Sequence, residues 1–123
     1  MKLTDAEEQL MHHLWQAGKA FMKELLEAYP EPKPAPTTVA TLLKRMIDKG
    51  FVAYREYGNS REYYPLVAKD AYFSSQMNGL ISSYFDDSAS QFASFFTKSG
   101  TLTPKELEEL KEIIDQQLKQ KKP

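Results

Sequence analysis

The sequence predicts a mainly α-helical fold with one small β-hairpin, and three observations predict it. Apolar residues recur at helical spacing in several separate segments of the 123-residue chain. One central segment, "FVAYREYGNSREYYPLV", is instead rich in aromatic and β-branched residues, with a glycine-containing turn in its middle. The composition, 41% hydrophobic and 27% charged, is typical of a globular protein. We therefore expect a small domain of helices and a hairpin, followed by further helices.

Two helices are expected before residue 30. Thr4 and Glu7 fit a capping box, so the first helix should begin at Thr4 and stop near Gly18. Trp15 belongs to its apolar stripe and should lie in the core. A second helix should run roughly over residues 21–29. Its inward-facing residues should be Phe21, Leu25, Ala28 and Tyr29.

The segment "PEPKPAP", residues 30–36, should be a stiff extended connector. Proline lacks an N–H and disfavours helix in the residue before it. A docking peptide for an SH3-like domain is the alternative interpretation. We favour the connector because the segment is short and lies between two predicted helices.

The segment "TTVATLLKRMIDKGF", residues 37–51, predicts a third helix, capped by Thr37 or Thr38 and ended by Gly50. One side of this helix is apolar: Val39, Leu42, Leu43, Met46 and Ile47. The hairpin follows, and Pro65 should end its second strand. Three helices followed by a hairpin indicate a winged helix-turn-helix domain over residues 1–67.

Residues 68–123 should be helical and should form a dimerisation region. One helix is expected from Lys69 to about Phe85, and the last helix should be capped by Thr103 and Glu106. A few separate amphipathic helices cannot bury their apolar faces alone, so a second copy of the chain should cover them. The expected dimerisation residues are Phe73, Met77, Leu80, Ile81, Tyr84, Phe85, Phe92, Phe95, Phe96, Leu107, Leu110, Ile113, Ile114 and Leu118.

Positive charge is concentrated in the middle of the chain, although the formal net charge is −1. Residues 33–61 have a surplus of basic residues, whereas residues 1–32 have a surplus of acidic ones. In a winged helix the third helix enters the DNA major groove and the hairpin lies beside the backbone. The candidate DNA-binding residues are therefore Thr37, Thr38, Thr41, Lys44, Arg45, Arg55, Asn59, Ser60 and Arg61. Lys33 is a further candidate for a backbone contact.

Each of these assignments has a simpler alternative. Thr38 could be only a helix cap, and Lys44 with Arg45 only a solvated face. The tip of the hairpin could be an ordinary polar turn. The hairpin tyrosines could stack on bases, but alternating strand faces favour core packing and cross-strand pairing for most of them.

No enzyme, metal site or cofactor is expected. The chain has no cysteine, which excludes disulfides, thiolate metal sites and a cysteine nucleophile. His12 and His13 are adjacent and point about a third of a turn apart, so they do not converge on a metal. The glutamates after Pro104 suit a helix start and a solvated face. Without a long apolar run or a secretory signal, a cytoplasmic protein with no membrane insertion is expected.

The chain resembles the BlaI/MecI/CopY family of bacterial transcriptional repressors, the penicillinase repressor family. The matching segments are "LTDAEEQLMHHLW", "TTVATLLKRMIDKGFV", "REYGNSREYYPLV", "YFDDSASQFASFF" and "LTPKELEELKEII". They cover nearly the whole chain in the order of the family, and the "TTVATLLKRMIDKGFV" segment is the most specific of them. The resemblance implies a homodimer that binds a dyad-symmetric operator in double-stranded DNA and represses transcription.

The resemblance also bears on how repression ends. In the β-lactam-responsive branch, a sensor protease pathway leads to cleavage at an Asn-Phe bond, and this chain has no Asn-Phe pair. In the copper-responsive branch, cysteines near the C-terminus bind metal, and this chain has no cysteine. The inducing signal therefore stays open.

Two other functions compete with the repressor interpretation. The first is a winged helix used for protein interaction, in which the third helix meets an acidic partner. The second is a regulator that senses a small ligand in a pocket between the DNA-binding domain and the C-terminal helices. Such a pocket could be lined by Phe85, Phe92, Phe95 and Phe96, although core packing is the better default for these rings because no polar groups converge there.

Overall fold

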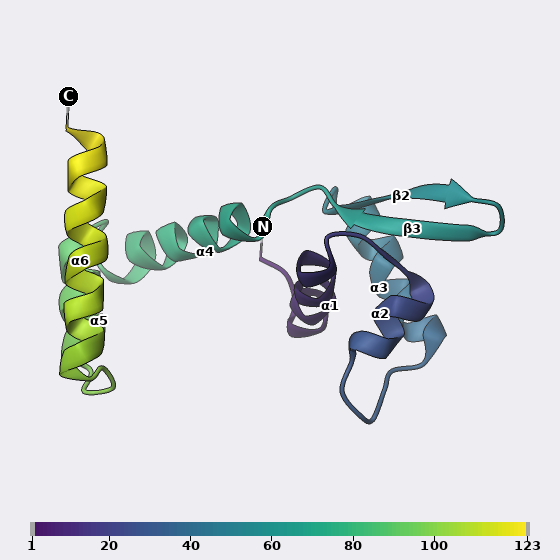
Figure 1. Cartoon of the computed structure of the whole chain (residues 1–123), viewed down its shortest axis with the longest axis horizontal. Coiled ribbons are helices and arrows are strands. Elements are labelled where there is room, and N and C mark those ends of the chain that lie inside the picture. The colour runs from purple at the N-terminus through teal and green to yellow at the C-terminus, as the bar shows by residue number, and fades with distance from the viewer. Residues whose placement is uncertain (1, 123) are drawn as a thin grey trace. The chain divides into compact units, whose positions relative to one another are not determined.

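The computed structural model describes residues 2–122, which form six helices and three short strands (Figure 1). The chain divides into two compact units, residues 1–76 and 77–123. The first unit contains the helices α1–α3, the strands and the beginning of α4. The domain division after residue 67 stays a prediction, and the first residues of α4 lie within the first unit.

Helix α1 (Asp5–Ala17) begins with the predicted capping box. The Glu7 N–H donates to Thr4 Oγ1 at 3.2 Å, and the Thr4 N–H donates to Glu7 Oε1 at 2.8 Å. Gly18 ends the helix at a φ of +79°, a conformation that glycine adopts without a steric penalty. Leu10, Met11 and Leu14 form the fully buried stripe of this helix.

A two-residue strand, β1 (Ala20–Phe21), precedes α2 (Met22–Ala28) and was not predicted. It pairs with β3 through Ala20↔Tyr63 and Phe21↔Glu62. So short a strand leaves no periodic signal in the sequence. The prediction that Ala28 faces inward was wrong. The buried side of α2 is centred between Leu25 and Leu26, and Ala28 points away from that direction.

Helix α3 (Pro36–Asp48) begins earlier than predicted, and the threonine cap was wrong. Ala35 is the N-cap residue, and no side chain caps the helix. Pro36 takes the first helical position, where its fixed φ and missing N–H cost nothing, so the two threonines lie inside the first turn. The helix ends at Asp48, and the predicted stop residue Gly50 follows the C-cap Lys49 with a φ of +80° and donates its N–H to Ile47 O at 3.0 Å.

The hairpin consists of β2 (Val52–Tyr57) and β3 (Ser60–Pro65), and the sheet order is β1-β3-β2. Tyr57 pairs with Ser60, so the turn has two central residues, and Gly58 adopts a φ of +60° there. Pro65 is the last strand residue, as predicted. Figure 1 shows the helices α1–α3 packed below this hairpin, which projects past them.

The core of the first unit forms where α1, α2 and α3 meet the sheet. Its fully buried side chains include Leu3, Leu10, Met11, Leu14, Leu25, Val39, Leu43, Met46 and Val52. Tyr72, near the start of α4, is also part of this core and is 3% exposed. Trp15 lies at the edge of the core and donates its Nε1–H to Val67 O at 2.8 Å. The core fixes α3 so that its polar side faces outward.

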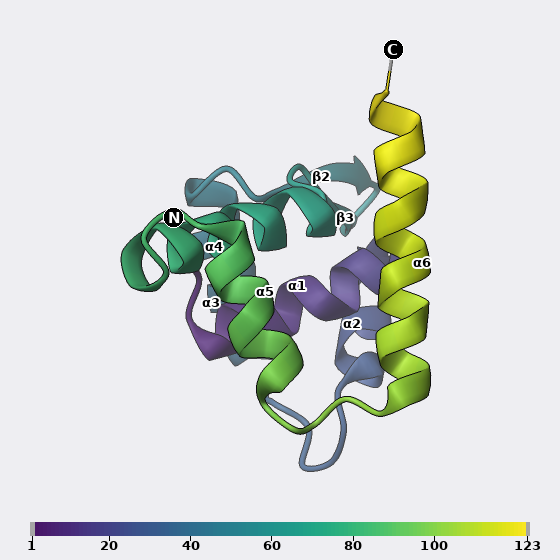
Figure 2. The same ribbon diagram turned by 90° about the vertical axis from the view of Figure 1, so that its left-hand side faces the viewer.

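The C-terminal part is helical, as predicted: α4 (Lys69–Tyr84), α5 (Ala89–Lys98) and α6 (Pro104–Lys121). Thr103 and Glu106 form the predicted capping box at the start of α6. None of the described residues of α5 and α6 is buried. Figure 2 shows the ribbons of α5 and α6 apart from each other.

Candidate nucleic-acid interface

The outward side of α3 carries the five residues that the sequence predicts for DNA contact: Thr37, Thr38, Thr41, Lys44 and Arg45. All five are exposed. Thr41 Oγ1 donates to Thr37 O at 2.9 Å, so its hydroxyl proton is used within the helix. The methyl group and both hydroxyl lone pairs of Thr41 are available to a partner.

Lys44 and Arg45 present their charges on two different borders of this side. Successive helical residues point about 100° apart. Lys44 lies on the border with Ala40 and Ile47, next to the hairpin. Arg45 lies on the opposite border. Among residues 2–122, no carboxylate forms an ion pair with either side chain.

The hairpin contributes Arg55, Asn59, Ser60 and Arg61, which are all exposed. The Arg61 guanidinium carbon lies 4.3 Å from the centre of the Tyr54 ring. The register pairs Arg55 with Glu62 and Glu56 with Arg61, so the two arginines lie on opposite faces of the hairpin. The sequence did not predict that the Tyr54 ring supports Arg61. This diagonal cross-strand contact depends on the strand register.

Two basic residues of the central segment are occupied elsewhere. Lys49 Nζ forms an ion pair with Glu7 Oε2 at 2.9 Å. Lys33 Nζ donates to the carbonyls of Tyr29 at 2.6 Å and Glu27 at 3.1 Å, and so caps the end of α2. The prediction that Lys33 contacts a DNA backbone therefore has a structural alternative. The basic groups of this segment that remain free of such bonds are Lys44, Arg45, Arg55 and Arg61.

Most of the hairpin tyrosines pack against the core or against each other, as the strand alternation in the sequence predicts. Tyr63 is buried, and Tyr54 and Tyr64 are half-buried. Tyr54 and Tyr63 are cross-strand partners with ring centres 5.8 Å apart. Tyr57 is the exposed member, and its ring lies 6.0 Å from that of Phe21. Packing therefore accounts for most of these rings.

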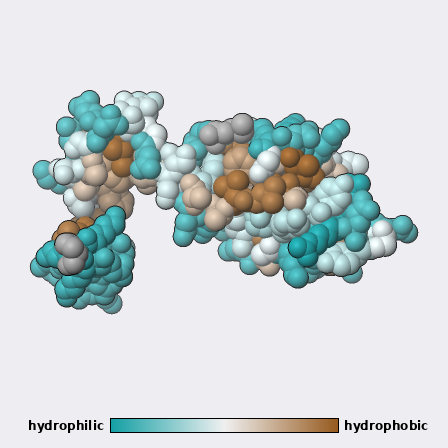
Figure 3. Space-filling model, turned by 90° about the horizontal axis from the view of Figure 1, so that it is seen from above, coloured by the Kyte–Doolittle hydropathy of each residue, from teal (hydrophilic) through white to brown (hydrophobic). Residues whose placement is uncertain are grey.

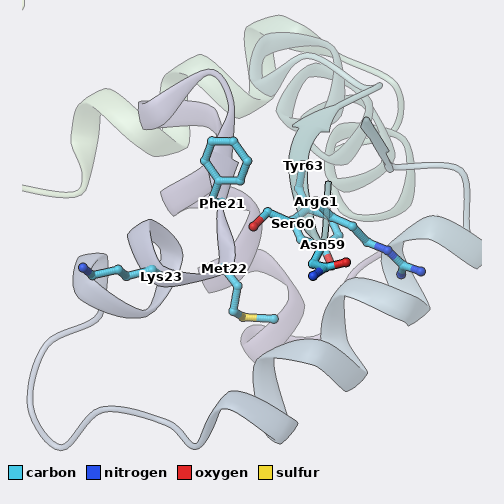
Figure 4. A pocket seen from close by; sticks show the side chains of 7 residues that line it. All are labelled: Phe21, Met22, Lys23, Asn59, Ser60, Arg61 and Tyr63. Carbon is cyan, nitrogen blue, oxygen red and sulfur yellow. The ribbon is translucent and has the colours of Figure 1, made fainter. Parts of the chain in front are cut away.

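An open pocket of about 320 Å³ lies between the start of α2 and the hairpin (Figure 4). Its lining residues are Phe21, Met22, Lys23, Asn59, Ser60, Arg61 and Tyr63. Figure 4 shows the Lys23 and Arg61 side chains extending in opposite directions, away from the pocket. The polar groups do not converge, so the pocket does not have the character of a small-molecule site.

The histidines and acidic residues form no metal site in the described part of the chain, residues 2–122. The His13 ring lies 4.4 Å from the Tyr29 ring. Burial, together with the nearby His12, lowers the pKa of His13. Within the same residues, no helix has the length and apolarity needed to cross a bilayer.

The predicted dimerisation residues leave large apolar areas uncovered. Ten of them are exposed: Phe73, Met77, Leu80, Tyr84, Phe95, Phe96, Leu107, Ile113, Ile114 and Leu118. Ile81, Phe85, Phe92 and Leu110 are half-buried. Figure 3 shows apolar side chains at the surface of the C-terminal helices among hydrophilic ones. Phe73 differs from the rest because its ring packs against Trp15 and Tyr72 in the first unit.

The sequence profile of the penicillinase repressor family matches residues 3–116. The chain belongs to the penicillinase repressor family. It is 21% identical over 122 residues to the penicillinase repressor of Bacillus licheniformis, covering 98% of this chain and 95% of that one. It is 24% identical over 115 residues to the methicillin resistance regulatory protein MecI of Staphylococcus aureus strain N315, covering 93% and 94%. The predicted family is confirmed.

Solved structures support the fold of this penicillinase repressor family member. The solution structure of the DNA-binding domain of the repressor BlaI matches with a TM-score of 0.51 and 25% identity, covering 58% of this chain and 88% of that one. A mutant MarR from E. coli matches with a TM-score of 0.51 and 17% identity, covering 95% and 79%, which bears on the fold alone. The winged helix-turn-helix prediction is confirmed. The relatives are repressors and regulators, in agreement with the prediction that the chain is not an enzyme.

Proposed function

We propose that this chain is a transcriptional repressor that binds a dyad-symmetric operator in double-stranded DNA as a homodimer. The observation that carries the proposal is the placement of four exposed cations on α3 and the hairpin: Lys44, Arg45, Arg55 and Arg61. Basic groups gathered on these two elements are what a winged helix needs to hold DNA. Membership of the penicillinase repressor family supports the same function.

In this proposal α3 enters the major groove. Thr37, Thr38 and Thr41 lie in its N-terminal half, where the side chains of a reading helix reach base edges. Lys44 and Arg45 lie one turn later and can neutralise phosphates or reach guanine O6 and N7. The hairpin residues Arg55, Asn59, Ser60 and Arg61 contact the backbone or the adjacent minor groove.

The uncovered apolar residues of the C-terminal helices support the homodimer in this proposal. A second copy of the chain would bury them and would bring two DNA-binding units together. Linked units gain effective concentration, so the pair binds two half-sites far more tightly than either unit binds one. An occupied operator blocks polymerase in the cytoplasm, where the DNA lies. A sensor protease pathway as the route of release stays a prediction from the family.

Fluorescence anisotropy tests the proposal. One duplex comes from the DNA upstream of the chain's own gene, a second has the same bases scrambled, and both are titrated at several salt concentrations. We expect salt-sensitive binding with about a thousandfold preference for the upstream duplex. The double variant Lys44→Ala, Arg45→Ala should lose most of this affinity.

The matched control is the double variant Lys119→Ala, Lys121→Ala, which removes the same charge from the end of α6. It should bind as the wild type does. Absence of binding to either duplex at low salt would contradict the proposal and would favour a protein-docking role for α3. Equal loss of affinity in both double variants would show that the loss is not specific to α3, and that α3 is not the contact surface.

A further inference from the structure

A groove of about 360 Å³ separates α3 from the hairpin. We call it the α3–hairpin groove, and its lining residues are Ala40, Leu43, Lys44, Ile47, Tyr54, Arg61 and Tyr63. Leu43 and Tyr63 are buried and form an apolar floor, whereas Lys44 and Arg61 are exposed. The groove therefore joins the two elements that are proposed to contact DNA.

The charges of this groove are of one sign. Lys44 comes from α3 and Arg61 from β3, and no acidic residue is part of the lining. Within residues 2–122, neither cation has a carboxylate partner at ion-pair distance. An anion bound between two like charges is attracted by both, and this attraction offsets their mutual repulsion. The apolar floor offers no carboxylate that would compete with such an anion for the two cations.

Arg61 is held in place by an aromatic ring. Its guanidinium lies 4.3 Å from the centre of the Tyr54 ring, within the range of a cation–π interaction. The Tyr54 ring packs in turn against the buried Tyr63 at 5.8 Å. Figure 4 shows the Arg61 side chain extending away from Lys23 and from the pocket beside α2. Stacking restricts a side chain that otherwise has many rotamers, so less entropy is lost when it binds.

We propose that the α3–hairpin groove binds one phosphate of the DNA backbone, held jointly by Lys44 and Arg61, with Tyr54 as the positioning residue. Arginine offers a planar fork to phosphate oxygens, and lysine adds a mobile point charge. A phosphate that is bound by both elements fixes how deeply α3 enters the DNA major groove and where the hairpin then lies on the DNA. This inference rests on the proposed DNA binding and adds the phosphate and the role of Tyr54.

A neutral phosphate analogue tests the shared contact. Duplexes carry a single methylphosphonate at successive backbone positions of a half-site, and each is titrated with wild type, Lys44→Ala and Arg61→Ala. On the unmodified upstream duplex, each variant should bind about tenfold more weakly. At one backbone position the analogue should lower the affinity of the wild type about tenfold as well. At that position it should not lower the affinity of either variant any further.

Two outcomes of this scan are informative in different ways. Suppose that the wild type binds the upstream duplex, but that the methylphosphonate position without effect on affinity differs between the two variants. Lys44 and Arg61 then contact different phosphates, so the shared contact is wrong while DNA binding stands. If the wild type binds neither the upstream nor the scrambled duplex, the proposed function fails and takes this inference with it.

The role of Tyr54 has its own test. Tyr54→Phe keeps the ring and should bind as the wild type does, whereas Tyr54→Leu should weaken binding about two- to fivefold. In an Arg61→Ala background, Tyr54→Leu should cost nothing further. Tyr64→Leu removes the ring beneath Arg55 on the opposite hairpin face, so any affinity that it loses should come through Arg55, and the analogue at the Lys44–Arg61 phosphate position should weaken it as much as it weakens the wild type.

Thermal melting of each variant separates binding from folding, because Tyr54 is half-buried. If Tyr54→Leu stays folded at the assay temperature and weakens binding equally with and without Arg61, the positioning role is overturned.

Discussion

Glu7 shows how one residue can connect two elements of the first unit. Its carboxylate is 1% exposed, accepts the Thr4 N–H, and meets Lys49 Nζ with both oxygens at 3.0 and 2.9 Å. Burial alone would raise its pKa, but the Thr4 hydrogen bonds and the Lys49 charge outweigh burial and leave the pKa below 4.5. This carboxylate ties the start of α1 to the end of α3.

We predict that Glu7→Gln lowers the free energy of unfolding by ~2 kcal/mol at neutral pH. Glutamine can still accept the Thr4 N–H, so the change mainly removes the ion pair. Because the folded pKa is depressed, the carboxylate stabilises the fold above its ordinary pKa of 4.5, and this stability is lost as the pH falls through the lower folded value.

Urea titrations at a series of pH values measure this effect. The gap between wild type and Glu7→Gln should be widest above pH 4.5 and should narrow below it. Glu27→Gln, at an exposed position of α2, is the control and should show little change. A gap that is constant down to strongly acidic pH would contradict the ion-pair account.

Thr41 is the residue at which base reading is tested most cleanly. Thr41→Ala should weaken binding to the upstream duplex about fivefold and leave binding to scrambled DNA nearly unchanged, because a methyl contact with thymine is specific. Thr97→Ala is the matched control: Thr97 makes the same backward bond, to Ala93 O at 2.7 Å, but lies in α5. Equal losses on both duplexes in anisotropy would rule out base reading by Thr41.

At the scale of elements, the hydroxyl and the ring of Tyr72 attach α4 to α1. The Leu3 N–H donates to the Tyr72 hydroxyl oxygen at 3.0 Å, and that hydroxyl donates to Glu8 Oε2 at 2.6 Å. The Tyr72 ring also packs against Trp15 and Phe51 with ring centres 5.9 Å away. The beginning of α4 is therefore part of the first unit.

We expect Tyr72→Phe to lower the free energy of unfolding by ~1–2 kcal/mol, because it leaves the Leu3 N–H without an acceptor while keeping the ring. Denaturant unfolding followed by tryptophan fluorescence measures the change, since Trp15 lies against Tyr72. Tyr84→Phe, at an exposed position of the same helix, is the control. Equal stability of the two variants would show that the hydroxyl does not attach α4.

The predicted elements were correct where a local rule decides them. The Thr4 and Thr103 caps and the Gly50 stop each depend on residues within one turn, and all three were found as expected. The start of α3 was misplaced because Pro36 competes with the threonines for the first turn. Strand β1 was missed because its two residues are defined by their partner strand.

At the scale of the whole molecule, the candidate surface was predictable but its electrostatics were not. Helical periodicity alone places Lys44 and Arg45 on the outward side of α3. That Lys49 pairs with Glu7, distant in the sequence, depends on tertiary packing. The stacking of Arg61 on Tyr54 likewise depends on strand register. Charge counted along the sequence therefore overstates how many of the cations are free for DNA.

The proposed dimer is tested by placing a charge on the apolar side of α6. Ile114 is 59% exposed in the single chain, and Ile114→Asp should weaken dimerisation at least about a hundredfold because a buried carboxylate would lack a partner. Sedimentation velocity measures the change. Gln116→Asp adds the same charge on the far side of the helix and should stay dimeric. An intact Ile114→Asp dimer would place Ile114 outside the interface.

The most direct test of the central claim is a hydroxyl-radical footprint on the DNA upstream of the chain's own gene, with wild type and Ile114→Asp. A dimeric repressor should protect two symmetric half-sites whose centres lie about one or two helical turns apart, and the variant should lose this protection at the same concentration. Protection of a single site without symmetry, equal for both proteins, or no protection at saturating protein, would contradict the account.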